Sequence, residues 1–132
     1  MQKAEGRSEE EMAAGPRDLR ERTTEFALRV IRMYCALPKT TEAQVIGKQA
    51  LRSGTSVGAH YREASRARSK KEFASKLEGG LAELEETAYW LELLAKAKIV
   101  SASRLQPLRD EADELLRIFV SAVNTAKQER GR

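Results

Sequence analysis

The chain has 132 residues, the size of one compact domain, and leaves no room for two. Hydrophobic residues make up 41% of it and charged residues 33%, so we expect a buried core beneath a heavily solvated surface. No apolar stretch approaches the ~18 residues that a membrane span needs, and the first fifteen residues lack the apolar block of a secretory signal. The single cysteine excludes an intramolecular disulfide and a multi-cysteine zinc site. These features predict a cytoplasmic, bacterial-type protein.

A first helix is predicted over about residues 18–36, after a disordered tail of residues 1–16 that mixes glycine, serine and charged side chains without periodicity. Residues 17–132 are then expected to form the folded domain. The apolar side chains of this helix are spaced mostly at three and four, as on one helix face: Leu19, Phe26, Val30, Met33 and Leu37. Pro38 should end the helix, because proline lacks the N–H that an interior position donates.

A second helix is predicted over residues 41–67 and a third over residues 69–98. Each begins with a hydroxyl residue, Thr41 or Ser69, followed three positions later by Gln44 or Glu72, which is the spacing of a capping box. The small side chains of residues 53–59 weaken the second helix and are expected where another helix approaches closely.

A fourth helix is predicted after Ser103, with Pro107 tolerated in its first turn. Its apolar residues repeat at four and three, as in the seam between packed helices: Leu108, Ala112, Leu115, Phe119, Ala122 and Ala126. Four amphipathic helices with short connections predict an all-α, up-down antiparallel four-helix bundle, and no strand pattern competes.

Charge is polarised along the chain. Residues 48–76 carry eight basic and two acidic side chains, a net +6, whereas residues 77–114 carry four basic and nine acidic ones, a net −5. At about 100° per residue, four cations of the second helix share an arc of roughly 80°, and three more follow in the next turn. We call these seven residues the basic stripe: Lys48, Arg52, Arg62, Arg66, Arg68, Lys70 and Lys71. Such a stripe can bind phosphates, and a solvated face, or one paired with the acids of a neighbour, has the same pattern.

The second half of the third helix is apolar nearly all round. Phe73, Leu77, Leu81, Leu84, Ala88, Leu91 and Ala95 share one face of this helix. Further apolar residues lie opposite or beside that face, which predicts a second buried surface and hence a subunit interface. The expected interface residues are Ala82, Tyr89, Trp90 and Leu93.

Two stretches of the sequence are distinctive. They are residues 51–64, LRSGTSVGAHYREA, and residues 69–94, which open with SKKEF and close with ETAYWLELL. Together they resemble the four-helix-bundle family of 23S rRNA-intervening-sequence proteins, over about residues 26–126. The resemblance implies a homo-oligomer, usually a pentamer, and kinship with accessory proteins of diversity-generating retroelements, which bind nucleic acid and a reverse transcriptase. The chain departs from the family pattern at His60, where asparagine is common, and at Gly79 and Gly80, where better helix formers are common.

Three features could carry other chemistry. Residues 54–58, GTSVG, match the nucleophile elbow of hydrolases, but the elbow needs a strand–turn–helix setting and this match lies within a predicted helix. His60 and Glu63 could share a metal ligand, but a di-iron bundle needs several inward carboxylates and paired Glu-x-x-His motifs; a histidine at a helix interface is the simpler interpretation. Cys35 has only Arg32 as a basic neighbour, which predicts a core or interface position rather than a reactive thiol. We therefore expect no enzyme activity, no metal and no cofactor.

The leading hypothesis is a non-enzymatic, homo-oligomeric bundle that binds structured RNA, or another nucleic acid, through the basic stripe. Aromatic residues are only 5% of the chain, so we expect salt-sensitive contacts to the phosphate backbone rather than base stacking. The alternative is a protein-interaction scaffold, or an accessory subunit of a nucleic-acid enzyme such as a reverse transcriptase, docking through a surface that includes Val45 and Leu51. Neither hypothesis involves a membrane.

Overall fold

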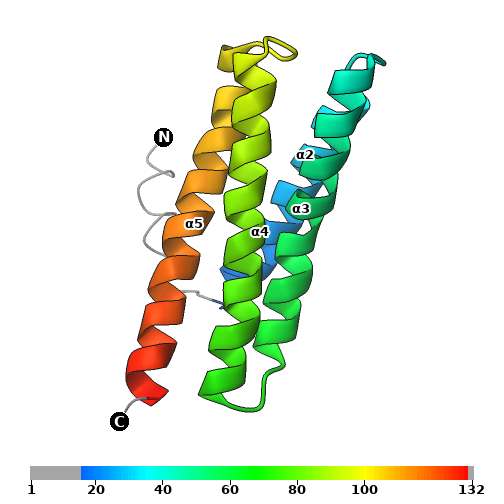
Figure 1. Cartoon of the computed structure of the whole chain (residues 1–132). Helices are drawn as coiled ribbons and strands as arrows, with labels where there is room; N and C mark the ends of the chain where they lie inside the picture. The colour runs from blue at the N-terminus through cyan, green and yellow to red at the C-terminus, as the bar shows by residue number, and fades with distance from the viewer. Residues whose placement is uncertain (1–15, 131–132) are drawn as a thin grey trace.

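Four helices make up residues 16–130, the part of the chain that the computed structural model describes (Figure 1). They are α2 (Pro16–Cys35), α3 (Thr41–Ser65), α4 (Lys70–Lys96) and α5 (Ala102–Arg130). The α2–α3 turn and the α4–α5 loop lie at one end, and the α3–α4 turn lies at the other. The predicted all-α bundle is confirmed. The predicted tail lies outside the described residues except for Pro16, which begins α2, a position where proline is favoured.

The start of α3 differs from the predicted capping box. Thr40, not Thr41, is the N-cap residue, and its hydroxyl accepts a hydrogen bond from the Ala43 N–H at 3.4 Å. The Gln44 amide instead donates to the carbonyl of Pro38 at 2.8 Å. The capping prediction was wrong by one residue because Thr40 and Thr41 offer the same hydroxyl, and the turn geometry decides between them.

The starts of α4 and α5 are also capped by serine. The Ser69 hydroxyl accepts from the Glu72 N–H at 3.0 Å, as predicted, but the Glu72 carboxylate accepts from the Arg68 N–H at 3.1 Å instead of from the cap residue. Helix α5 begins directly after Ser101, two residues earlier than expected. Pro107 therefore lies inside the helix, beyond its first turn.

The small residues of α3 lie against α2 at close range. An alanine Cβ at Gly54 would be 3.0 Å from a Val30 methyl carbon, and one at Gly58 would be 3.3 Å from the Thr23 hydroxyl oxygen. Gly47 is crowded in the same way by the end of α2. The expectation that small residues admit a neighbouring helix is thus confirmed, and the match to a nucleophile elbow lies in mid-helix.

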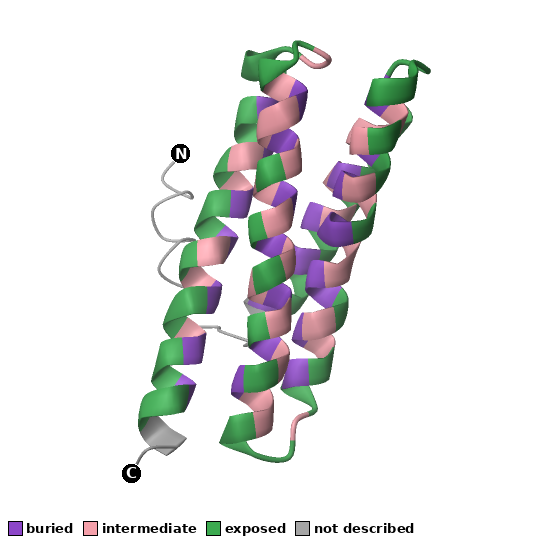
Figure 2. Cartoon of the chain, in the orientation of Figure 1, coloured by how far each residue is buried: buried purple, intermediate pink, exposed green. Residues whose placement is uncertain are grey.

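Helix α4 lies between α3 and α5 and packs against both (Figure 1). Its leucines Leu77, Leu84, Leu91 and Leu94 are fully buried, and Figure 2 shows the buried residues of all four helices turned inward. The Ser53 and Thr87 hydroxyls, both fully buried, are 2.7 Å apart and join α3 to α4. Because α4 has two neighbours within the chain, much of its apolar circumference is already buried without a second subunit.

Helices α2 and α5 touch only slightly. The Arg22 guanidinium spans this seam and donates to both carboxylate oxygens of Glu111, at 3.1 and 2.9 Å. The Glu114 carboxylate is 3.5 Å away on the same helix. The Arg22 and Glu111 side chains are 17% and 20% exposed, so their paired charges are partly shielded from solvent.

Candidate nucleic-acid interface

The α3–α4 turn gathers four exposed cations at one end of the bundle. Arg66 is the C-cap residue of α3, Arg68 lies in the turn, and Lys70 and Lys71 open α4. We call these four residues the turn cluster. Glu72 is the one acidic residue between positions 64 and 77, and its carboxylate accepts a hydrogen bond from a backbone amide of the turn. The turn cluster thus carries a local excess of positive charge.

Arg52 belongs to the basic stripe in sequence, but its charge is matched by acids of α4. Its guanidinium is 3.4 Å from Glu83 and makes a shorter contact with Glu86. The Trp90 indole N–H also donates to Glu86, at 3.0 Å. The hydrogen bonds from Trp90 and Arg52 lower the pKa of Glu86, and the bond to Glu86 raises the pKa of Arg52. Arg52 is therefore an α3–α4 tie more than an open phosphate contact.

Arg62 and Lys48 are separated from the turn cluster in different ways. The half-buried Arg62 side chain donates to the Thr24 hydroxyl at 3.1 Å and is held against α2. Lys48 is exposed, but it precedes Arg66 by 18 residues, which places it about 27 Å away along the helix axis. This spacing exceeds the Debye length of about 8 Å at physiological salt, so the stripe is not a single electrostatic surface.

Two lysines near the turn cluster were not among the predicted site residues, and both are paired. Lys76 Nζ lies 3.7 Å from Glu63 Oε1, and Lys127 of α5 pairs with Glu78 of α4. Glu63 and Lys76 lie equally far in sequence from the α3–α4 turn, so their pairing could have been predicted from the sequence. The α4–α5 pair depends on the register of the last hairpin. Neither of these two pairs takes up the charge of Arg66, Arg68 or Lys71 in the turn cluster.

His60 lies against the two glycines of α4 and between two acids. Its ring nitrogens are 3.8 Å from Glu63 and 3.9 Å from Glu83, and Nδ1 is buried without a hydrogen-bond partner. An alanine Cβ at Gly79 would lie 2.8 Å from ring atoms of His60. At Gly80 the Cβ would lie 3.2 Å from His60 Cβ. The two departures from the family pattern are therefore in contact: the glycines leave room for the imidazole.

The features that suggested other chemistry have structural explanations. The Ser56 hydroxyl donates to the Arg52 carbonyl of its own helix at 2.8 Å. Within residues that the structure describes, no cluster of three or more histidine, cysteine or acidic side chains could hold a metal ion. Cys35 is exposed, so it does not lie in the core, and the interface position that was the other expectation for it stays a prediction. None of the described helices is long and apolar enough to cross a membrane.

The four predicted interface residues lie together on α4. Ala82 and Tyr89 are exposed, Tyr89 by 52%, and Trp90 and Leu93 are half-buried. The Tyr89 and Trp90 rings pack with centroids 5.0 Å apart. Val45, named for the alternative docking surface, is 58% exposed on α3, and Leu51 is half-buried. An oligomer interface at Tyr89 stays a prediction.

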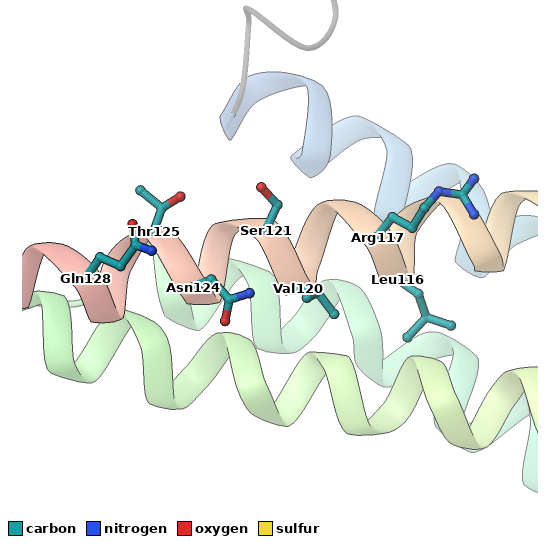
Figure 3. Close-up of a pocket in the computed structure, with 7 residues that line it drawn as sticks. All are labelled: Leu116, Arg117, Val120, Ser121, Asn124, Thr125 and Gln128. Carbon is teal, nitrogen blue, oxygen red and sulfur yellow. The ribbon is translucent and has the colours of Figure 1, made fainter.

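A shallow hollow of about 480 Å³ runs along α5 (Figure 3). Leu116, Val120 and Asn124 project toward α4, whereas Ser121 and Thr125 project from the opposite side of α5. Its lining carries one charged side chain, so no charges converge there. A second hollow of about 280 Å³ between α4 and α5 mixes three acids with Arg109. Neither lining suits a polyanion as well as the turn cluster.

The comparisons with known proteins agree with the sequence resemblance. The family model described as 23S rRNA-intervening sequence protein matches residues 18–121. Among solved structures, the chain is similar to a protein of unknown function from the S23 ribosomal protein family of Bacteroides thetaiotaomicron, with 34% identity and a TM-score of 0.77. That similarity covers 83% of this chain and 97% of the other. No curated protein matches the chain.

Proposed function

Because the chain belongs to the family of 23S rRNA-intervening sequence proteins, we propose that it is a non-enzymatic, homo-oligomeric bundle that binds structured nucleic acid through its phosphate backbone. The turn cluster carries this proposal. Its four side chains are exposed at one end of the molecule and outnumber the single acid among them. Lysine and arginine at such a density bind phosphates without reading sequence.

The residues of the basic stripe differ in how readily they can contact phosphates. Phosphates meet the turn cluster first, because Arg52 is paired with acids of α4 and Arg62 is held by Thr24. Lys48 reaches only a nucleic acid long enough to follow α3 toward the other end. In the pentamer that the family resemblance implies, five turn clusters around one axis would bind a single RNA together, and avidity would multiply a modest affinity.

The test is the salt dependence of RNA binding, measured by fluorescence anisotropy with a dye-labelled RNA hairpin. Four phosphate contacts per subunit predict a slope of about −3.6 in log affinity against log salt for duplex-like sites. The variant Arg66→Glu/Lys71→Glu should bind at least tenfold more weakly. The matched control Lys39→Glu/Lys98→Glu changes the same charge at the opposite end and should have little effect.

Two results would contradict the proposal. Absence of RNA binding at low salt would refute the function itself. Equal losses in the two double variants would show that net charge, rather than the turn cluster, drives binding. The mass of the complex, measured by light scattering, separately tests the proposed homo-oligomer and its number of subunits.

The alternative function is an accessory subunit for a nucleic-acid enzyme such as a reverse transcriptase. The observation that supports this alternative is the exposed side chain of Val45, an apolar residue in the first turns of α3 that a protein partner could cover. If this alternative is correct, Val45→Asp should abolish capture of the enzyme while leaving the salt slope of RNA binding unchanged. Loss of RNA binding with retained capture in the turn-cluster variant would separate the two activities.

A further inference from the structure

A hollow of about 440 Å³ lies where the α2–α3 turn faces the α4–α5 loop, at the end of the bundle remote from the turn cluster (Figure 1). Its floor is aliphatic: Leu37, Leu105 and Leu108 are buried, and Met33, Ile99 and Val100 are half-buried. The exposed lining residues Ala36, Pro38 and Pro107 leave it open to solvent. Its size falls within the range of about 300–1,000 Å³ that ligand pockets have.

Three arginines line the hollow with no acid among the lining residues: Arg29, Arg32 and Arg104. Arg29 is half-buried and Arg104 is exposed. Neither guanidinium has a hydrogen bond or an ion pair to another described residue. Arg32 pairs with Glu25 at 3.1 Å, but both side chains are more than half exposed, so the pair is weak and can be exchanged. An unmatched positive charge therefore surrounds an aliphatic floor.

We propose that this hollow is a docking site for a short acidic and apolar segment of a partner protein. One or two apolar side chains of the segment fill the hollow, and neighbouring carboxylates meet Arg29 and Arg104. Guanidinium groups bind carboxylates through paired, charge-assisted hydrogen bonds. These bonds fix the orientation of the carboxylate in addition to matching its charge. The inference does not depend on the proposed nucleic-acid function.

The lining argues against other occupants. It contains no aromatic side chain on which a base could stack, so single-stranded nucleic acid lacks its usual contact. Small-molecule pockets bury most of their ligand's surface, whereas this hollow is open along one side. A peptide segment suits an open hollow because it continues across the rim and makes further contacts there. Since the turn cluster lies at the other end of the bundle, RNA and a partner can bind at the same time.

The test uses two blocked five-residue peptides and the full chain, observed by ¹H–¹⁵N NMR. The first peptide places two leucines between a glutamate and an aspartate and ends in phenylalanine; the second has glutamine and asparagine instead of the two acids. We expect the acidic peptide to shift backbone signals of residues 36–38 and 99–105 and to bind at least tenfold more tightly than the neutral one. The double variant Arg29→Glu/Arg104→Glu should lose this binding at least tenfold.

A matched control has the same charge change outside the hollow. Arg20→Glu/Arg117→Glu reverses two exposed arginines of the same two helices and should retain the affinity. If the double variant does not fold, Arg104→Glu alone keeps the test, because this side chain is exposed. The proposal is overturned if the acidic peptide shifts no signals at the hollow, or if the neutral peptide binds equally well. It is also overturned if octanoate or an RNA hairpin binds the hollow more tightly, or if the double variant lowers the oligomer mass, which would identify a second copy as the occupant.

Discussion

Replacing Gly79 with alanine should destabilise the protein when His60 is present and stabilise it when His60 is absent. Alanine in mid-helix is normally favoured over glycine by about 1 kcal/mol. Here the added methyl group would lie 2.8 Å from Cε1 and Nδ1 of the imidazole. That separation is well inside van der Waals contact, so the ring must move or the two helices must separate.

The expected magnitudes follow from these opposed effects. Overpacking a filled site costs about 1–3 kcal/mol, and the helix-propensity gain offsets about 1 kcal/mol of it. Gly79→Ala in the wild type should therefore lower the free energy of unfolding by up to about 2 kcal/mol. In the His60→Ala background the clash is gone, and the same change should raise it by about 1 kcal/mol. The coupling energy between the two positions is then about 1–3 kcal/mol.

A double-mutant cycle measured by urea denaturation, with circular dichroism as the signal, tests this prediction. Gly80→Ala is the matched control, because its Cβ would lie 2.8 Å from Phe119 Cε2 whether or not the imidazole is present. It should destabilise both backgrounds. If Gly79→Ala stabilises the wild type as much as it stabilises His60→Ala, the imidazole simply swings aside and the steric explanation for the two glycines fails.

Three further predictions concern single contacts. Arg22→Ala should lower the free energy of unfolding by about 1–2 kcal/mol, because its bidentate pair is partly buried; the exposed control Arg32→Ala should cost less than about 1 kcal/mol, and equal losses would contradict the argument. The pKa of Glu86 is lowered in the folded protein, so its contribution to stability is present above the ordinary carboxyl pKa and is lost as pH falls through the lowered value. The emission of Trp90, the sole tryptophan, should therefore shift at acidic pH, and a shift retained in Glu86→Gln would rule out this origin. Tyr89→Ser should lower the oligomer mass measured by light scattering, and an unchanged mass would exclude Tyr89 from the interface.

Helix periodicity and capping residues were enough to predict the four helices. The predicted ends at residues 36, 67 and 98 lie one or two residues beyond the observed ends at Cys35, Ser65 and Lys96. Buried polar residues were missed, because polarity alone places Thr23 on the surface. Its hydroxyl instead donates to the Leu19 carbonyl at 2.8 Å, which satisfies it inside the core.

The candidate site was predicted only in part, because one helix cannot show what its neighbours do to its charges. Three of the seven cations of the basic stripe lie in α3, but the acids that match Arg52 come from α4. The register of the α3–α4 hairpin could have been predicted from the sequence, since residues equally far from a tight turn face each other in antiparallel helices. His60 and Gly79 both lie about ten residues from the Ser69 cap, a position that predicts their contact.

The arginine-lined hollow had no comparable signal in the sequence. Arg29 and Arg104 are 75 positions apart and belong to helices that touch only slightly. Their approach depends on how two end loops fold over the bundle, and loop geometry is not contained in hydrophobic periodicity. Lys98, in the α4–α5 loop, adopts a positive φ of 61°, which its residue type does not predict.

The slight contact between α2 and α5 has a consequence for how the molecule opens. Each described helix packs chiefly on its neighbours in the chain, so within residues 16–130 α2 is attached along one side to α3 and is tied to α5 through Arg22. Such an element is expected to detach before the rest unfolds, and its amide hydrogens should exchange faster than those of α4. Folding can proceed from adjacent hairpins with low contact order, which favours rapid folding. The same architecture permits two copies to exchange α2.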